Sequence, residues 1–244
     1  MIKIGADPEL FVYTMDHKPV SAHDLLPGNK LFPYPVTRGA MQVDGVAAEF
    51  NIEPAATEDE FLFNIRSVRD EMLEELRKQG NYILRAQPTI KFTRKQWNAI
   101  PDSAKELGCE PDFSAYTLEA NPKPHTNKFM RTGSGHVHIS WDDKSDDPFD
   151  TGWMAYCADL VKHLDHHLMP QAVKWDKDRE RMELYGKAGA FRPKSYGVEY
   201  RVLSNAWLAT EARIRYVFRT VHFITTKWAS GFVPSDYKVE DYAA

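Results

Sequence analysis

The amino-acid sequence predicts an α+β protein built around an antiparallel sheet. Segments with the alternating or short apolar pattern of strands are interspersed irregularly with helix-like segments. A doubly wound parallel sheet would instead show strands and helices in regular alternation. The chain has 244 residues, 43% of them hydrophobic, and no linker-like stretch divides it, so we expect one domain over residues 1–244.

The N-terminal segments predict strands around a long loop. Apolar residues at 2–4 and 10–13 indicate one strand, or two strands broken at Pro8. Residues 18–39 are rich in Pro, Gly and Asn and predict a loop. Residues 41–52 alternate around Asp44 and Gly45, which indicates a strand pair or a bulged strand.

The clearest helix follows residue 57. Thr57 and Glu60 have the spacing of a capping box. Apolar residues then recur at 61, 65, 68, 72 and 76, which is one helix face, and Gly80 is a typical C-cap. Residues 153–169 and 211–228 predict two further helices.

The remaining segments are less regular. Residues 83–92 predict a strand pair or one bent strand, and residues 97–108 predict short helices and turns. Residues 109–133 contain three prolines and predict a loop. Residues 137–141 predict a strand.

Composition excludes several classes of protein. The net charge is −4, with 31 basic and 35 acidic residues and no Lys/Arg-rich run, which argues against a nucleic-acid-binding protein. No stretch reaches the ~18 apolar residues of a membrane span, and the first ten residues do not resemble a signal peptide. Two cysteines, Cys109 and Cys157, favour buried thiols in a reducing compartment, so we expect a cytoplasmic protein.

Two pairs of acidic residues are candidate metal ligands. Asp7 and Glu9 are two apart, so in a strand they share one face, and adjacent carboxylates repel unless a cation lies between them. Such oxygen ligands suit Mg²⁺, Mn²⁺ or Ca²⁺. The alternative places Asp7 in a solvated turn before Pro8. Glu49 follows small and apolar residues and is a candidate inward-pointing acid, whereas Asp44 before Gly45 favours a hairpin turn.

Two histidines form a second candidate site. His136 and His138, in GSGHVHISW, share one strand face and follow a flexible Gly-Ser-Gly segment. Neutral imidazoles bind metals. The alternative is a pair of hydrogen-bonded structural histidines.

The segment FRPKSYGVEYR contains both positively and negatively charged side chains. Arg192, Glu199 and Arg201 form either a structural salt-bridge network or a site in which the arginines hold phosphate and Glu199 holds a metal. Arg131 and Lys187 are further candidate phosphate contacts.

These motifs resemble those of a known superfamily. GSGHVHISW is similar to the glutamine synthetase signature Gly-Ser-Gly-Met-His-Val-His-x-Ser, lacking the Met. GADPELF resembles the acid-x-acid strand of glutamine synthetases and glutamate–cysteine ligases, and FRPKSYGVEYR resembles their late Arg…Glu-x-Arg motif. With DGVAAEFN and GCEPDFSAY, the set most resembles the phage-encoded carboxylate–amine ligases of type 2, and the motifs span residues 5 to 201.

The resemblance implies a curved antiparallel sheet with helices packed on one face, and two metal sites. Asp7 and Glu9 would divide between the sites. Glu49 would join Glu9 at one, while His136 and Glu199 would join Asp7 at the other. The first acid is Asp where Glu is common, which shortens its reach. The acid beside Glu49 is not identified by the motifs, and either Glu53 or Asp44 fits.

The resemblance also implies residues that contact nucleotide phosphates. His138 would touch the nucleotide or the transferred phosphoryl group, and Arg192 and Arg201 would neutralise that group during transfer. Arg131 and Lys187 are expected among the nucleotide contacts.

The implied reaction is ATP-dependent and uses Mg²⁺ or Mn²⁺. A carboxylate would be phosphorylated, and an amine would then displace phosphate to give an amide. The partners would be small-molecule or peptide carboxylates and amines, with no nucleic acid and no membrane, and an oligomer is compatible with the sequence. A phage-encoded enzyme of this kind would act in the host cytoplasm.

Two other functions remain open from the sequence. A metal-dependent hydrolase or a cupin-type oxygenase can use the His136/His138 pair, but this leaves the motif at 192–201 unexplained. A catalytically degenerate binding module is the second alternative, against which the intact acidic residues argue.

Overall fold

The strands of the protein pair in an antiparallel manner throughout the part of the chain that the structure describes. The structure is a computed structural model and describes residues 1–105, 111–122 and 127–232. The five-stranded sheet consists, in spatial order, of β1 (Lys3–Ala6), β11 (Val137–Ser140), β13 (Gly197–Tyr200), β12 (Ala190–Lys194) and β9 (Phe113–Ser114).

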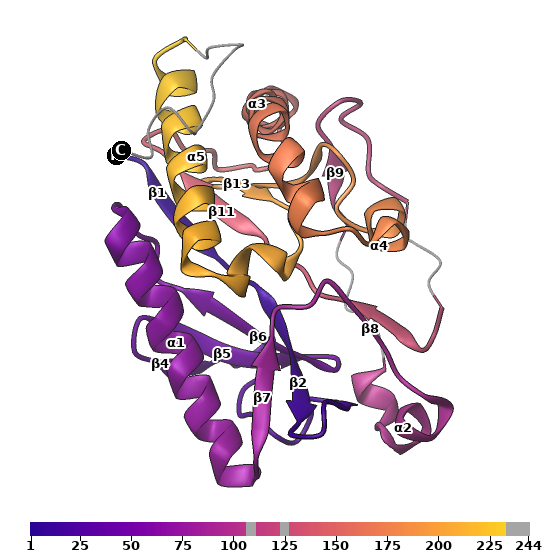
Figure 1. The fold of residues 1–244 in the computed structure, drawn as a ribbon. Helices are drawn as coiled ribbons and strands as arrows, with labels where there is room; N and C mark the ends of the chain where they lie inside the picture. The colour runs from indigo at the N-terminus through magenta and orange to yellow at the C-terminus, as the bar shows by residue number, and fades with distance from the viewer. Residues whose placement is uncertain (106–110, 123–126, 233–244) are drawn as a thin grey trace.

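A six-stranded sheet and a two-stranded sheet complete the set (Figure 1). In the six-stranded sheet β7 pairs with β2, and the other strands follow in the order β3 (Pro19–Val20), β2 (Glu9–Thr14), β6 (Ala47–Ile52), β5 (Gly39–Asp44) and β4 (Tyr34–Val36). The bounds of β7 are Tyr82–Arg85. The two-stranded sheet pairs β8 (Thr89–Lys91) with β10 (Met130–Thr132).

The N-terminal segment joins the two larger sheets. β1 belongs to the five-stranded sheet and β2 to the six-stranded sheet, and Asp7 and Pro8 lie between them. The junction is bonded on both sides, because Asp7 N donates to His136 O (3.4 Å) and Phe50 N donates to Pro8 O (3.2 Å). Of the two alternatives that the sequence left open, the structure has two strands broken at Pro8, and the two sheets curl into one antiparallel surface.

Three long helices cover one face of this surface (Figure 1). α1 packs on β5, β6 and β7, while α3 and α5 pack on strands of the five-stranded sheet and on each other. The helices are α1 (Glu58–Gln79), α2 (Arg94–Ala99), α3 (Thr151–Trp175), α4 (Arg179–Leu184) and α5 (Glu211–Ala229), with 3₁₀ turns η1 (Asp102–Ala104) and η2 (Asn205–Ala209).

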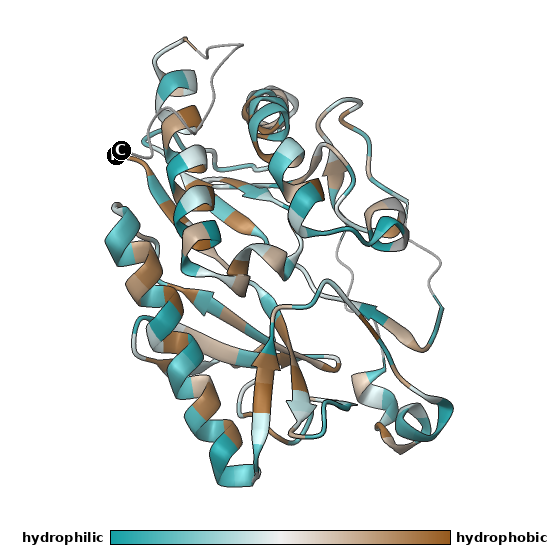
Figure 2. Cartoon of the chain, viewed as in Figure 1, coloured by the Kyte–Doolittle hydropathy of each residue, from teal (hydrophilic) through white to brown (hydrophobic). Residues whose placement is uncertain are grey.

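The pattern of α1 explains its position. Its apolar residues at steps of three and four are buried, and hydrophobic and hydrophilic residues alternate around the helix (Figure 2). Thr57 caps the helix by accepting from Glu60 N, and Gly80 N donates to Leu76 O at the other end. The expected capping box is incomplete, because the Glu60 carboxylate accepts from Ala56 N rather than from the N-cap residue.

The opposite face is only partly covered. Phe11 and Tyr13 of β2 point away from the long helices and form a second apolar cluster with Trp97 of α2 and neighbouring residues. The helices therefore do not all lie on one face, because α2 packs against the other. Polar side chains occupy the uncovered part of this face.

Other differences from the sequence reflect pairing with distant partners. β7 and β8 do not pair with each other, because β7 pairs with β2 and β8 with β10. The segments expected to be loops contain β3, β4, β9 and β10, and α3 extends beyond both expected ends. Cys157 is a buried free thiol, whereas Cys109 lies outside the described residues. No helix in the described ranges has the length and apolarity needed to cross a membrane.

Candidate active site

One face of the five-stranded sheet carries a row of polar side chains. Cross-strand pairing places Gly5 opposite His138, His138 opposite Glu199, and Glu199 opposite Arg192. Residues that alternate with them, such as Val137 and Val198, are buried in the core under the helices. The period of two along each strand therefore directs the chemistry to the face opposite the helices.

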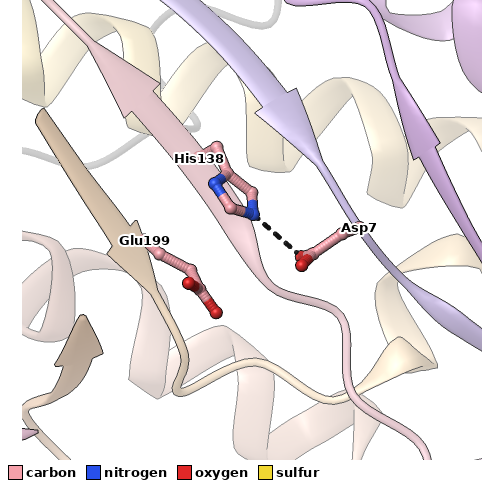
Figure 3. A group of neighbouring side chains, drawn as sticks. All are labelled: Asp7, His138 and Glu199. Atoms are coloured by element: carbon pink, nitrogen blue, oxygen red, sulfur yellow. Dashed lines mark ion pairs between the residues drawn. The ribbon is translucent and has the colours of Figure 1, made fainter. Parts of the chain in front are cut away.

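Asp7 lies at the end of this row, directly after β1. Its Oδ1 atom is 3.1 Å from Nε2 of His138 and 3.6 Å from Nδ1 of His136. Figure 3 shows Asp7, His138 and Glu199 directed from three neighbouring segments towards the same space. Suitable ligand atoms of these three residues lie within 4.8 Å of one another. Asp7 Oδ1 is nevertheless buried without a hydrogen bond of adequate geometry.

Glu199 is surrounded by positive charge. Its side chain is 1% exposed, and its carboxylate lies 2.9 Å from Lys194 Nζ and 3.1 Å from Arg192 Nη1 and also pairs with Arg201 Nη1. Burial alone would raise the pKa of Glu199, but the charges of Arg201, His138 and Arg192 hold it well below the usual range. Glu199 is therefore ionised and held in place.

The two histidines differ in their protonation. Burial and the charge of Arg201 lower the pKa of His136 to about 3, so its imidazole is neutral and can offer a lone pair to a metal. Burial also opposes the charged form of His138, but Asp7 and Glu199 outweigh it and raise the pKa. Its other nitrogen, Nδ1, lies 2.6 Å from the hydroxyl of Tyr196. His138 thus links Tyr196 to Asp7.

A second group of acids lies on the six-stranded sheet. Glu9 of β2 and Glu49 of β6 are directly opposite each other in the ladder. Burial and the charges of Asp44 and Asp7 raise the pKa of Glu9 to about 7, and burial, Asp7 and Glu9 raise that of Glu49 well above the usual value. Like charges directly opposite in a sheet destabilise it, so this pair favours a proton or a cation between the strands.

The partners of these acids are neutral. Ser134 N donates to Glu9 Oε2 at 2.8 Å, and Gln42 Nε2 donates to Glu49 Oε2 at 2.8 Å. Neither partner compensates the negative charge. The repulsion is consequently left for a ligand to relieve.

Asp44 is the third acid of this group. It shares a strand face with Gln42 at the end of β5 and raises the pKa of both Glu9 and Glu49. The hairpin at Gly45 exists as expected, with a left-handed φ of 57°, but Asp44 also faces the acids. Glu53, the other candidate, points outward and pairs with Arg38. The structure favours Asp44.

The two groups meet in one cavity of about 290 Å³. It contains the five predicted metal ligands and three of the predicted phosphate contacts. These lining residues are Asp7, Glu9, Glu49, His136, Glu199, Arg131, Arg192 and Arg201. Residues that are nearly 200 positions apart in the sequence are therefore neighbours in the fold.

Three other predicted residues have different surroundings. His138 contacts Asp7 from the edge and does not line the cavity. Arg131 lines it, but its guanidinium donates to the carbonyls of Lys128, Met130 and Lys105 and lies over the ring of Trp97. Lys187 is exposed and does not line the cavity.

Several residues of the site were not predicted from the sequence. Lys194 shares the strand face of Arg192, and this i, i+2 spacing was the available signal. Asp112, whose Oδ2 accepts from Arg201 Nε at 3.1 Å, and Tyr196 carry no local pattern. Their proximity depends on which strands pair.

The fold and site define an α+β protein with a cavity in which carboxylates and a neutral imidazole lie beside fixed arginines. This donor set suits divalent cations together with anionic ligands. Residues 150–233 match the family model described as phage phiEco32-like COOH.NH2 ligase-type 2. These residues are thus similar to a carboxylate–amine ligase family, in agreement with the resemblance of the motif at residues 191–201. No curated protein matches the sequence.

Proposed function

We propose that the protein is an ATP- and Mg²⁺-dependent carboxylate–amine ligase with a glutamine-synthetase-like catalytic domain. It forms an amide bond through an acyl phosphate and releases ADP and phosphate. The observation that carries the proposal is the convergence of Asp7, Glu9, Glu49, His136 and Glu199 in one cavity with Arg192 and Arg201. The ligase family match over residues 150–233 supports the reaction class. Because the reaction consumes ATP, we expect the protein to act in the cytoplasm. For a phage-encoded enzyme this is the cytoplasm of the host.

The chemistry of the donor set fits a divalent cation such as Mg²⁺ or Mn²⁺. Asp7 Oδ1 is buried and has only the contact with His138 Nε2 at 3.1 Å, and Glu9 and Glu49 face each other without an ion pair to any described residue. Asp7, His136 and Glu199 would hold one ion, and Glu9 and Glu49, with Asp44 nearby, would hold another. Bound ions would neutralise the charge of the nucleotide phosphates and of the transferred group.

The arginines act on the phosphoryl group. An oxygen of the substrate carboxylate attacks the γ-phosphorus of ATP, the bond to the bridging oxygen breaks, and ADP leaves. Negative charge spreads over the transferred oxygens during this step. Arg192 and Arg201 carry fixed positive charge into the cavity and are oriented by Glu199, Pro111 O and Asp112. Such pre-oriented donors stabilise charge without reorganising.

The second step needs a dry pocket and a proton acceptor. The amine nitrogen attacks the acyl carbon, phosphate departs with its bonding electron pair, and the nitrogen loses one proton. Carboxylates that line the cavity can accept that proton. Since water would hydrolyse the acyl phosphate, the cavity must exclude water while both substrates are bound.

One observation favours an alternative. Glu199 already has three cationic partners, as a purely structural network would, and this fits a degenerate binding module. The open cavity argues against that module, because its acids remain accessible to a ligand. A hydrolase that uses the two histidines leaves the arginines without a role.

The test measures products from ATP. The protein, MgCl₂ and ATP are incubated with pools of carboxylates and amines, and condensation products are sought by mass spectrometry. The proposal expects ADP, phosphate and a product lighter than its two precursors by one water. Release of AMP and pyrophosphate would contradict it, since that indicates adenylation of the carboxylate.

A further inference from the structure

Arg181 of α4 is a buried cation in the wall of the same cavity. Its side chain is 3% exposed. No sequence motif points to it, and neither the phosphate contacts nor the metal ligands described above include it. A buried guanidinium needs partners for its donors, so its contacts decide what it can do.

Few of the hydrogen-bond donors of this guanidinium have a partner in the protein. The one ion pair of Arg181 among the described residues joins Nη1 to Asp176 Oδ2 at 3.4 Å, which is long for a charged hydrogen bond. Its Nε is buried and has no hydrogen-bond partner. The other three arginines of the cavity differ, because Arg192 and Arg201 bind Glu199 and Arg131 donates to backbone carbonyls.

The backbone around Arg181 holds the guanidinium in one place. Gly186 has a left-handed φ of 68°, and a Cβ atom there would lie 2.9 Å from Nη1 and 3.0 Å from Nη2 of Arg181. Asp176, which is itself buried, accepts from Asp178 N as well as from Arg181. The donor group is therefore fixed in position while one of its donors is unused, which is the arrangement of a binding site prepared for an anion.

Buried polar groups are normally hydrogen-bonded, and each exception calls for an explanation. Arg181 Nε is such an exception in the wall of the cavity. Asp7 Oδ1, by contrast, already has Nε2 of His138 at 3.1 Å. The unused donor of Arg181 therefore indicates that a ligand supplies its partner.

The position of Arg181 identifies which part of a ligand it meets. Burial lowers the pKa of Arg181, and the carboxylates of Asp176 and Glu9 partly oppose this. Arg181 is thus on the Glu9 side of the cavity, whereas Arg192 and Arg201 cluster at Glu199. The phosphoryl group has its cations at Glu199, so Arg181 meets a different anionic group.

We infer that Arg181 binds a non-reacting carboxylate of one of the two substrates. This inference rests on the proposed ligase function and narrows its substrate class. The planar fork of arginine matches the geometry of a carboxylate, which can accept from Nε and one Nη together. The carboxylate has two sources, namely a second acid group on the acid substrate or the acid group of an amino-acid amine.

The experiment follows the Nε–Hε resonance of Arg181 by ¹⁵N NMR in the full chain with Mg²⁺. The resonance is assigned by its loss in Arg181→Lys. Arg213, whose Nη1 donates to Ala206 O outside the cavity, is the internal control. The probes are glutarate, which has two carboxylates and no amine, glycine, which has one carboxylate and an amine, and inorganic phosphate.

The inference expects glutarate or glycine to move the Arg181 resonance in a saturable manner, at concentrations where phosphate does not and Arg213 stays unchanged. Glutarate would assign the site to the acid substrate and glycine to the amine. Measured by isothermal titration calorimetry, Arg181→Lys should bind the same probe about tenfold more weakly than wild type, since lysine keeps the charge but loses the planar fork, and Arg213→Lys should bind it as wild type does.

Two results would overturn the inference. If phosphate moves the Arg181 resonance at a concentration equal to or lower than that of both carboxylates, Arg181 is a phosphate contact. If neither carboxylate moves the resonance, Arg181 has no role in binding the substrates. Product formation from ATP is measured separately. A protein that forms an amide without an Arg181 response would lose this inference and keep the proposed function.

Discussion

The substitution Glu9→Gln tests whether the facing acids are a cation site. Glutamine has the same shape and can still accept from Ser134 N, so the substitution removes mainly the charge. In the metal-free protein above about pH 7, the ionised Glu9 is buried and lies opposite Glu49. We expect the variant to be more stable than wild type under these conditions.

The size of the effect follows from the pKa. Burial, with Asp44 and Asp7, raises the pKa of Glu9 from 4.5 to about 7. At about 1.4 kcal/mol per pKa unit, ionisation opposes folding by about 3 kcal/mol at most, and solvent in the cavity reduces this to about 1–3 kcal/mol. A raised carboxyl pKa weakens the fold as pH rises, so the penalty starts above pH 4.5 and is complete above about pH 7.

The assay is urea unfolding at pH 5 and pH 8, with EDTA or with MgCl₂. Mg²⁺ at a hundred times its Kd should stabilise wild type by about 2.7 kcal/mol and the variant by clearly less. Glu53→Gln is the matched control, because Glu53 is exposed and pairs with Arg38 outside the cavity. If Glu9→Gln destabilises the metal-free protein at pH 8, or if Mg²⁺ stabilises both proteins equally, the reasoning fails.

Three further substitutions separate the site from its framework. Glu199→Gln should lower the free energy of unfolding by about 3 kcal/mol, because three cations lose their counter-charge, and should abolish ADP release below its melting temperature; activity in the folded variant would leave Glu199 a structural role only. Lys187→Ala should change kcat/KM for ATP less than twofold, because Lys187 is exposed outside the cavity, whereas a large loss would restore it as a nucleotide contact. Asp165→Asn should cost about 1–3 kcal/mol in urea unfolding, because Tyr200, Tyr116 and Gly189 donate to this buried carboxylate; an unchanged midpoint would contradict that estimate.

Local patterns were enough to predict the long helices and the hairpin. The apolar residues of α1 repeat at steps of three and four between Thr57 and Gly80, so its ends and its buried face follow from nearby residues alone. The β5–β6 hairpin likewise follows from alternation on both sides of Gly45. These elements depend on contacts within about ten to twenty residues along the chain.

Pairing between distant strands could not be predicted from the same patterns. Residues 83–92 predict a strand pair or one bent strand, but β7 and β8 each pair with strands from other parts of the chain. The partners of these two strands lie outside the window in which the pattern is visible. The capping box differs for a local reason, because the Glu60 carboxylate accepts from Ala56 N, one residue before the expected Thr57.

The candidate site divides in the same way. Asp7, Glu9, His136 and Glu199 belong to motifs with i, i+2 spacing in or directly beside strands, and the fold brings them into one cavity. Arg181 lies in a short helix without such spacing, and only the fold reveals its burial and its unpaired Nε. Lys187 has the right charge for a phosphate contact, but its backbone position keeps it outside the cavity.

The central claim is that the cavity couples ATP to amide formation. The most direct measurement follows ATP by ³¹P NMR while mass spectrometry follows pools of carboxylates and amines, with wild type and Glu9→Gln compared side by side. The account predicts equal amounts of ADP, phosphate and a dehydrated condensation product from wild type, and none from the variant. AMP and pyrophosphate, or phosphate release without a condensation product in the presence of every acid and amine pool, would contradict it.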